Sequence, residues 1–212
     1  MIRLRTQSGL KAAELATIAG VHVRTIEGWL RETYPAIAAR AKAEGAAIYW
    51  ADETAVKEDA HWIRGFAPAG RTPVLEMPAR WGKLSMISAI TNRGEISFQI
   101  VEGTINAERF IEFLAHLLED ATAKVFLIVD NLRVHHAKIV RDWAEPLKDK
   151  IELFYLPPYA PESNPDEHLN HDFKTSLRLE PASDNDNDLM QKAMPIMKRI
   201  AQIPGRVQSY FQ

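Results

Sequence analysis

Three acidic residues occupy positions from which their carboxylates can share a cation. Asp52 and Asp130 each follow an apolar segment, and Glu167 ends the short sequence Asn-Pro-Asp-Glu. A carboxylate beside an apolar core costs free energy unless its charge is compensated, and a divalent cation compensates several carboxylates at once. The three residues therefore predict a metal site suited to chemistry on a phosphodiester.

That chemistry gives each carboxylate a distinct role. Two-metal phosphoryl chemistry needs ions roughly 3.5–4 Å apart, bridged by one carboxylate and flanked by others, to activate a water and stabilise the leaving oxygen. We expect Asp52 to bridge the ions, with Asp130 and Glu167 as flanking ligands. All three are predicted to be catalytic residues and metal ligands.

Other roles remain open for Asp130 and its neighbours. Asp130, followed by Asn131, could cap a turn at the end of a strand. His135 and His136 are more often packing or surface histidines than ligands. Glu53, next to Asp52, is expected to be solvated or to support the ligands from outside.

Glu167 also has a structural alternative. Asn164 is a good N-cap and Pro165 suits the first helical position, so Glu167 would complete a capping box at the third. Asp166 competes with Glu167 for the third ligand position. In this helix Leu169, Phe173 and Leu177 are expected to face the core, and the face bearing Glu167, Asn170 or His171, and Lys174 is expected to line a cleft.

The elements that position these residues follow from the apolar pattern. Strands are predicted at 47–51, 61–66, 84–90, 96–101, 125–129 and 151–156. Helices are predicted around the repeat of Phe110, Phe113, Leu114, Leu117 and Leu118, at about 137–148 and from about 165. An antiparallel meander followed by a βαβ unit predicts an α/β fold, a mixed sheet flanked by helices. The stretch 184–188, Asp-Asn-Asp-Asn-Asp, is predicted to be a solvated loop.

The first 45 residues predict a helical DNA-binding segment. Residues 10–31 have the spacing of two helices with Gly20 in the turn, and a third helix is expected at about 33–44, closed by Gly45. This spacing is typical of a helix-turn-helix, although an ordinary αα-hairpin is the alternative. A second helix at about 22–31 would present these residues to the major groove: His22, Arg24, Thr25 and Gly28.

Composition agrees with this division into 1–45, a helix-turn-helix and connecting helix, and 46–212, a catalytic domain. The 212-residue chain has a net charge of −2, yet residues 1–45 carry seven Lys/Arg against four Asp/Glu, which leaves the remainder acidic. Cysteine is absent, which excludes disulfides and thiolate metal sites. No apolar run approaches the roughly 20 residues that span a bilayer, so a cytoplasmic protein without membrane contact is expected.

Three motifs together carry a family resemblance. They are Trp-Ala-Asp-Glu-Thr at 50–54, Val-Asp-Asn-Leu-Arg-Val-His-His at 129–136, and Leu-Pro-Pro-Tyr-Ala-Pro-Glu-Ser-Asn-Pro-Asp-Glu at 156–167. In this order they resemble the DDE transposases of bacterial insertion sequences in the mariner-like superfamily. The 36 residues between Asp130 and Glu167 are close to the spacing in that superfamily.

The resemblance implies a ribonuclease H-like fold, two Mg²⁺ or Mn²⁺ ions, and Asp52, Asp130 and Glu167 as the catalytic triad. It implies a transposase that cleaves DNA at the ends of its element and transfers the strand to a target. The expected partners are double-stranded DNA, as inverted-repeat ends and as target, and a second copy of the chain in a homodimer on DNA. Bound to DNA, the protein would associate with the nucleoid. Arg133 and Lys174 are candidate phosphate contacts.

One departure from the family pattern leaves other functions open. Members usually carry two helical DNA-binding subdomains, whereas here one helix-turn-helix is joined almost directly to the first catalytic strand. The alternative function is therefore a catalytically inactive or truncated remnant, from an internally deleted copy, that only binds DNA. A host nuclease of the same fold is a third hypothesis.

Overall fold

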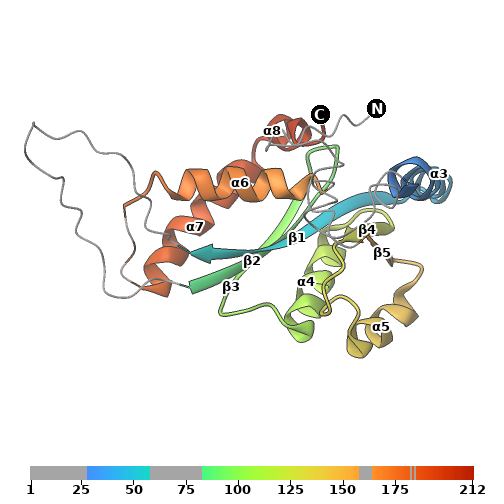
Figure 1. The fold of residues 1–212 in the computed structure, drawn as a ribbon, viewed down its shortest axis with the longest axis horizontal. Coiled ribbons are helices and arrows are strands. Elements are labelled where there is room, and N and C mark those ends of the chain that lie inside the picture. The colour runs from blue at the N-terminus through green and yellow to red at the C-terminus, as the bar shows by residue number, and fades with distance from the viewer. Residues whose placement is uncertain (1–27, 58–82, 158–163, 182, 184) are drawn as a thin grey trace, which may run out of the picture.

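The mixed sheet predicted from the sequence is present in the computed structural model, which describes residues 28–57, 83–157, 164–181, 183 and 185–212 (Figure 1). Its strands, in the order β3-β2-β1-β4-β5, are β1 (Ala47–Lys57), β2 (Lys83–Ile90), β3 (Ile96–Glu102), β4 (Val125–Val129) and β5 (Ile151–Tyr155). β1, β2 and β3 pair in antiparallel fashion, whereas β4 runs parallel to both β1 and β5. The predicted strand at 61–66 lies outside the described residues.

β1 is longer than the apolar pattern predicts. The expected strand stopped at residue 51, but β1 continues through Asp52 to Lys57, and its second half pairs with β2 as far as Lys83. Thr54 and Val56 are buried on this extension. Backbone pairing with β2 extends the strand beyond the point where its apolar run stops, so Asp52 lies within the strand rather than at its end.

Helices cover both faces of the sheet. They are η1 (Trp29–Thr33), α3 (Tyr34–Glu44), α4 (Ala107–Asp120), α5 (Lys138–Ala144), η2 (Glu145–Leu147), α6 (Asp166–Leu177), α7 (Asp186–Ala201) and α8 (Pro204–Ser209). α6, α7 and α8 lie on one face, and α4 and α5 on the other (Figure 1). None of the helices in the described part of the chain is long and apolar enough to cross a membrane.

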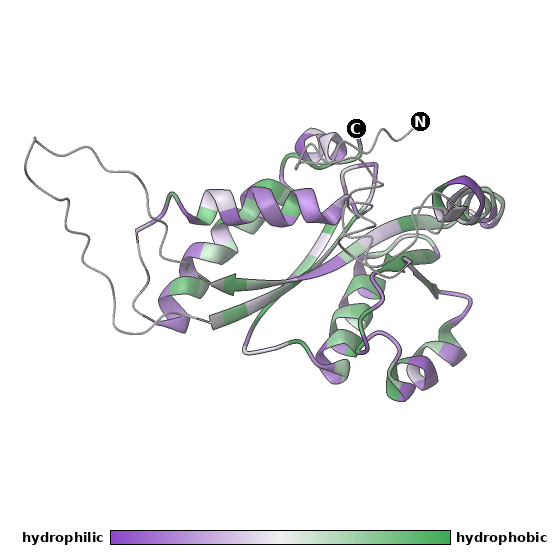
Figure 2. Cartoon of the chain, viewed as in Figure 1, coloured by the Kyte–Doolittle hydropathy of each residue, from purple (hydrophilic) through white to green (hydrophobic). Residues whose placement is uncertain are grey.

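Each face of the sheet therefore has its own core. Trp50 and Ile128 pack with residues of α6 and α7, whereas Tyr49 and Ala51 pack with residues of α4 and α5. β4 lies between the two cores and is buried along its whole length, so it is apolar throughout (Figure 2). Alternate residues of β1 consequently face opposite helical layers.

α4 forms as its periodicity predicts. Its N-cap residue, Asn106, accepts a hydrogen bond from the backbone N–H of Arg109 at 2.9 Å. The predicted apolar residues Phe110, Phe113 and Leu114 are fully buried against the sheet. Local capping and the apolar stripe thus specify the same helix.

The helix before β1 corrects one prediction. A break was expected between helices at about 22–31 and 33–44, but the described part is helical without interruption from residue 28 to residue 44. Pro35 has no N–H with which to continue the α-helical ladder, and the preceding turn is a π-helix whose Tyr34 N–H bonds to Trp29 O. The wider turn accommodates the proline within the helix instead of ending it.

The acidic stretch near residue 185 corrects a second prediction. Asp186 and Asp188 are not loop residues, because they form the first turn of α7. Asn185 caps this helix by accepting the Asp188 N–H at 3.0 Å, and acidic side chains are favourable near the positive end of a helix dipole. The polar composition therefore marks a helix start rather than a solvated loop.

Candidate active site

Asp52 lies on the face of β1 that is covered by α6. Asn170 of α6 is buried and donates a hydrogen bond from its Nδ2 to Asp52 Oδ2 at 2.8 Å. Burial raises the pKa of Asp52 to about 7, and the negative charges of Glu167 and Asp130 add to this rise. The charges of Glu167 and Asp130 therefore both act on Asp52.

The start of α6 is tied directly to β1. Asn164 is buried; its Nδ2 donates to Ala51 O at 2.8 Å, and its Oδ1 accepts the Asp166 N–H at 3.1 Å. The predicted capping box is wrong in this detail, because its side-chain bond should go to the Glu167 N–H, which instead donates to Asn164 O. The N-cap of α6 is Pro165 rather than the predicted Asn164, and Asn164 instead fixes the start of the helix beside Asp52.

Asp166 and Glu167 occupy opposite environments. Asp166 is completely buried and accepts a hydrogen bond from Ser88 Oγ at 2.7 Å, whereas Glu167 is exposed. Burial, followed by the charge of Asp52, raises the pKa of Asp166 well above its ordinary range. Asp166 is thereby favoured as a neutral, enclosed group, and Glu167 is the accessible carboxylate of the pair.

Asp130 directly follows β4 and adopts the turn-capping role named as its alternative. Its Oδ1 accepts the backbone N–H of Leu132 at 3.1 Å. This bond uses one carboxylate oxygen and leaves the other for a second partner. Turn capping and metal ligation are therefore compatible at Asp130.

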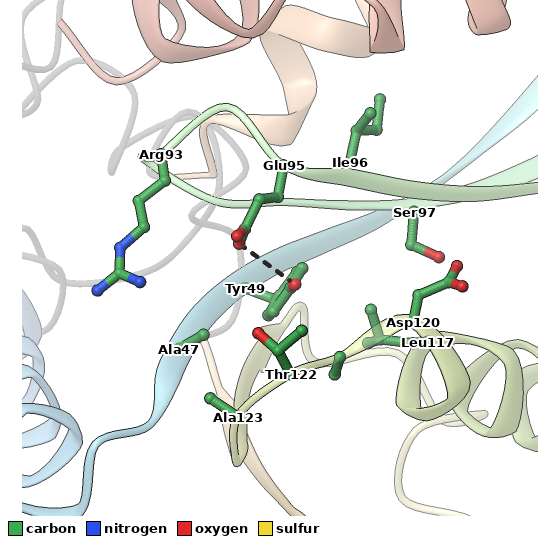
Figure 3. Close-up of a pocket in the computed structure, with 11 residues that line it drawn as sticks. Ala47, Tyr49, Arg93, Glu95, Ile96, Ser97, Leu117, Asp120, Thr122 and Ala123 are labelled. Carbon is green, nitrogen blue, oxygen red and sulfur yellow. Dashed lines mark hydrogen bonds between the residues drawn. The ribbon is translucent and has the colours of Figure 1, made fainter.

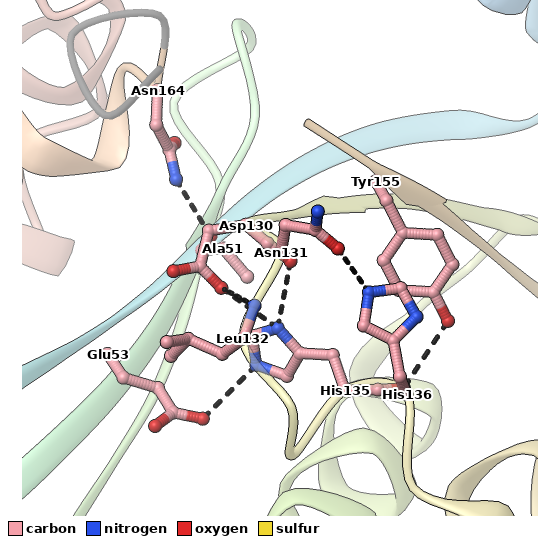
Figure 4. A network of polar contacts seen from close by, with 9 residues as sticks. All are labelled: Ala51, Glu53, Asp130, Asn131, Leu132, His135, His136, Tyr155 and Asn164. Atoms are coloured by element: carbon pink, nitrogen blue, oxygen red, sulfur yellow. Dashed lines mark hydrogen bonds and ion pairs between the residues drawn. The ribbon is translucent and has the colours of Figure 1, made fainter. Parts of the chain in front are cut away.

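His135 is a site residue that sequence reasoning missed (Figure 4). Its side chain is 2% exposed and lies between two carboxylates, with Nδ1 3.0 Å from Asp130 Oδ1 and Nε2 3.2 Å from Glu53 Oε1. Burial alone would lower the pKa of His135, but the bonds to Asp130 and Glu53 outweigh it and raise that pKa to about 9. Glu53 lies far away in the sequence, so no local signal joins it to His135.

His136 is a surface histidine, as expected. It is exposed, its Nε2 contacts Asn131 Oδ1, and its ring stacks on Tyr155 with centroids 4.2 Å apart (Figure 4). The side chain of His135, its neighbour in the sequence, instead lies between Asp130 and Glu53. The two adjacent histidines thus have different environments.

The predicted DNA contacts are only partly described. Arg133 is exposed in the segment after β4, and Lys174 is half-buried on α6. Gly28 lies in the helix just before η1, with right-handed helical φ and ψ. The predicted reading residues His22, Arg24 and Thr25 lie outside the described residues, so their role stays a prediction.

The donor chemistry of the site fits divalent cations. Among the described residues, no three His, Asp or Glu side chains are grouped closely enough to hold a metal ion. Carboxylate oxygens are nevertheless the ligands that Mg²⁺ prefers. The pKa of Asp52 is raised mainly by burial and further by the charges of Glu167 and Asp130, the two carboxylates that would share the ion. A cation would relieve this repulsion.

A separate polar cavity lies between the start of β1 and the end of α4 (Figure 3). It measures about 160 Å³ and is lined in part by Tyr49, Glu95 and Asp120. The Tyr49 hydroxyl donates to Glu95 Oε2 at 3.4 Å. None of the predicted site residues lines this cavity, so it is distinct from the site around Asp52.

Comparison with known families assigns the class of protein. Residues 47–190 match the family described as DDE superfamily endonuclease, and this match covers more than half of the chain. The chain belongs to that family. A search of curated proteins found no significant match.

Solved structures agree on the fold. The chain is similar to the catalytic domain of Mos1 mariner transposase, with 18% identity, a TM-score of 0.53, and coverage of 90% of this chain and 94% of that chain. It is also similar to the Mos1 strand transfer complex, with 16% identity, a TM-score of 0.53, and coverage of 97% and 75% respectively. The sheet and its helices have the ribonuclease H-like fold of that catalytic domain.

Proposed function

We propose that this chain is a transposase that catalyses metal-dependent cleavage and strand transfer of DNA at the ends of an insertion sequence. The observation that carries the proposal is the position of Asp52 on β1, bonded to Asn170 of the helix whose first turn carries Glu167, in a member of a DDE endonuclease family. Cleavage and strand transfer are both in-line attacks on phosphorus, first by water and then by a DNA hydroxyl. One site can therefore serve both steps.

In this proposal each residue has a defined role. Asp52, Asp130 and Glu167 would hold two Mg²⁺ or Mn²⁺ ions, which when bound supply Lewis-acid activation of water and charge stabilisation at the scissile phosphate. Asn170 orients Asp52 through its hydrogen bond to Oδ2. Burial keeps Asp166 neutral, so it would support α6 rather than bind an ion.

The proposed partners are double-stranded DNA and a second copy of the chain. Arg133 is exposed close to Asp130 in the sequence, and Lys174 lies on α6, whose first turn carries Glu167. Both are placed to contact phosphates that flank the scissile bond. The similar solved structures include Mos1 in a pre-cleavage transpososome and in a strand transfer complex.

The first prediction tests the catalytic assignment. Asp52→Asn should reduce Mg²⁺-dependent cleavage of end-containing DNA by at least about 100-fold, a loss of about 3 kcal/mol of transition-state stabilisation. DNA binding should stay nearly unchanged, because the substitution leaves the predicted binding residues intact. Nicking and gel-shift assays on duplexes from the flanks of the gene measure both quantities.

Asp142→Asn is the matched control, since Asp142 is an exposed carboxylate of α5 that pairs with Lys138. Normal cleavage by Asp52→Asn would contradict the active-site assignment. Wild-type protein that binds ends but never cuts with Mg²⁺ or Mn²⁺ would support the remnant hypothesis instead. Equal cutting of random duplex would support a nuclease without end specificity.

The second prediction separates Glu167 from Asp166. Glu167→Gln should abolish cleavage, because the amide weakens an accessible metal ligand. Asp166→Asn should retain activity within about tenfold, since an amide oxygen can still accept the Ser88 Oγ hydrogen bond and the buried carboxyl is already favoured as neutral. Cleavage rates of the two variants at saturating Mg²⁺ decide between Glu167 and Asp166. If Asp166→Asn abolishes cleavage and Glu167→Gln retains it, Asp166 is the third ligand.

A further inference from the structure

We propose that His135 is a positioning residue that fixes the Asp130 carboxylate for metal binding by bridging it to Glu53. The inference rests on the proposed function, because it assigns a support for one proposed metal ligand. Its basis is geometric. His135 joins the end of β4 to the middle of β1 from within the core, between two carboxylates that are otherwise separate.

The contacts place an acceptor at each ring nitrogen of His135. Nδ1 lies 3.0 Å from Asp130 Oδ1 and 3.1 Å from Asp130 O, and Nε2 lies 3.2 Å from Glu53 Oε1. A carbonyl and an ionised carboxylate can only accept hydrogen bonds. The ring is therefore held from both ends by acceptors, and it cannot flip without losing a bond.

Packing removes the remaining freedom of the ring. The Phe110 ring of α4 lies 4.5 Å from the His135 ring, centroid to centroid, and Phe110 is fully buried. The Tyr155 hydroxyl donates to His135 O at 3.3 Å, and the His135 N–H donates to Leu132 O at 3.1 Å. Backbone and side chain of His135 are thus both fixed by the core.

A fixed His135 determines which oxygen of Asp130 is available. Oδ1 accepts the Leu132 N–H and forms the 3.0 Å ion-pair contact with His135 Nδ1, whereas among the described residues Oδ2 has no hydrogen bond or ion pair. Oδ2 is consequently the oxygen presented to an ion. Support of a metal ligand by an adjacent hydrogen-bond donor sets the orientation of that ligand, and losing it commonly costs roughly 10–100-fold in metal affinity.

The same bridge removes Glu53 from competition for the ion. Glu53 follows Asp52 in β1, so its side chain leaves the opposite face of the strand, toward the layer of α4 and α5. Its Oε1 is occupied by His135. Two adjacent carboxylates on one strand therefore have different roles: Asp52 is turned toward α6, and Glu53 anchors the residue that supports Asp130.

Two substitutions separate the ends of the bridge. His135→Asn places an amide N–H near the position of Nδ1 and can still donate to Asp130, whereas His135→Gln places its amide near Nε2 and favours Glu53. Mn²⁺ binding to the full-length, metal-free protein without DNA is measured by electron paramagnetic resonance. Mn²⁺-dependent cleavage is measured in parallel, and melting temperatures report on folding.

We expect His135→Gln to weaken Mn²⁺ binding by about 10–100-fold and His135→Asn by less than about fivefold. His116→Asn is the control, since His116 is an exposed histidine near the carboxylates of Glu119 and Asp120. If both His135 variants melt well below the wild type, Glu53→Ala removes the far anchor without touching Asp130. It should still weaken Mn²⁺ binding several-fold.

The outcomes separate this inference from the proposed function. Wild-type affinity in His135→Gln or in Glu53→Ala overturns the positioning role while leaving the transposase proposal intact. Equal losses in the Asn and Gln variants, in step with equal losses of melting temperature, also overturn it, because that pattern indicates only a structural role. Wild-type protein that binds no Mn²⁺ overturns both proposals.

Discussion

Asp52 combines two conditions that oppose its ionisation. It is partly buried beneath α6, and it lies within the influence of Glu167 and Asp130, so its pKa rises to about 7. Hydrogen bonds from the Glu53 backbone and from the Asn170 side chain partly offset this effect. An aspartate whose folded-state pKa lies far above its unfolded value makes the metal-free protein less stable as the pH rises.

The third prediction concerns this pH dependence. The pKa of Asp52 rises from 3.8 to about 7 on folding, so protonation of Asp52 favours the folded state at low pH. That contribution is lost as the pH rises from about 4 to above 7. In EDTA, Asp52→Asn should therefore be more stable than the wild type by about 1–3 kcal/mol at pH 8.5, with a smaller gain at pH 5.

Urea denaturation at the two pH values measures this difference. His135 has a folded pKa of about 9, and its stabilising charge is lost as the pH rises through that value. His135 contributes to stability in the same way in both proteins. The difference in stability between Asp52→Asn and wild type therefore reports on Asp52 alone. If Asp52→Asn gains the same stability at both pH values, the pKa of the Asp52 carboxylate is not raised in the folded protein.

At the scale of elements, α8 locks the β2–β3 turn to the helical layer. Gly94 in this turn has φ +89°, and an added Cβ would lie 2.5 Å from Pro204 O at the start of α8. Gln208 Nε2 donates to Arg93 O at 2.9 Å on the same side. The turn and the helix are therefore in direct backbone contact.

α8 is also held to α6 by an ion pair. Arg206 donates from Nε and from its terminal nitrogen to the two oxygens of Asp172, each at 2.6 Å, and the Tyr210 hydroxyl contacts the same carboxylate. A bidentate pair of this kind fixes orientation as well as distance. α8 thus links the β2–β3 turn to the helix that carries Glu167.

The fourth prediction compares two glycines with positive φ. Gly45, at the C-terminus of α3, has φ +66°, and a Cβ added there would meet no atom within 4 Å, so Gly45→Ala should cost about 1–2 kcal/mol through backbone strain alone. Gly94→Ala adds the clash with Pro204 and should cost a further 1–3 kcal/mol, roughly, through overpacking. Chemical denaturation of both variants measures the difference, and equal losses would show that α8 can shift freely.

At the scale of the whole molecule, charge is unevenly distributed along the chain. Residues 1–45 are net basic, whereas the remainder is net acidic. A net acidic region attracts DNA phosphates weakly by itself. The DNA affinity that we propose would therefore come from local contacts and from the number of chains that bind together.

The fifth prediction follows from this distribution. The helix-turn-helix predicted for residues 1–45 would read only a few base pairs, so specific end recognition should require a dimer that pairs two reading segments and two proposed catalytic sites. A monomer should bind ends weakly and with steep salt dependence. Sedimentation and footprinting of the full chain test this, and tight protection of a long end sequence by a monomer at physiological salt would refute it.

Local patterns alone predicted much of the fold and the candidate ligands. The continuous apolar run of β4 and the apolar repeat of α4 agree with the observed elements. A strand buried on both faces is apolar at every position, whereas a helix buried on one face is apolar at every third or fourth position. The motifs around Asp52, Asp130 and Glu167 indicated the family. The extension of β1, the unbroken helix through Pro35 and the start of α7 were not predicted, since pairing and capping overrode the apolar pattern.

The hydrogen-bond partners of the proposed ligands were decided only by the tertiary structure. Asn170 reaches Asp52 because α6 is anchored to β1 through Asn164, and His135 reaches Glu53 because β1 and β4 are neighbours in the sheet. These contacts join residues far apart in the sequence, and their geometry depends on strand register and helix packing. Sequence periodicity reports which face of an element is buried, but the identity of the residue opposite it is fixed only when the layers pack.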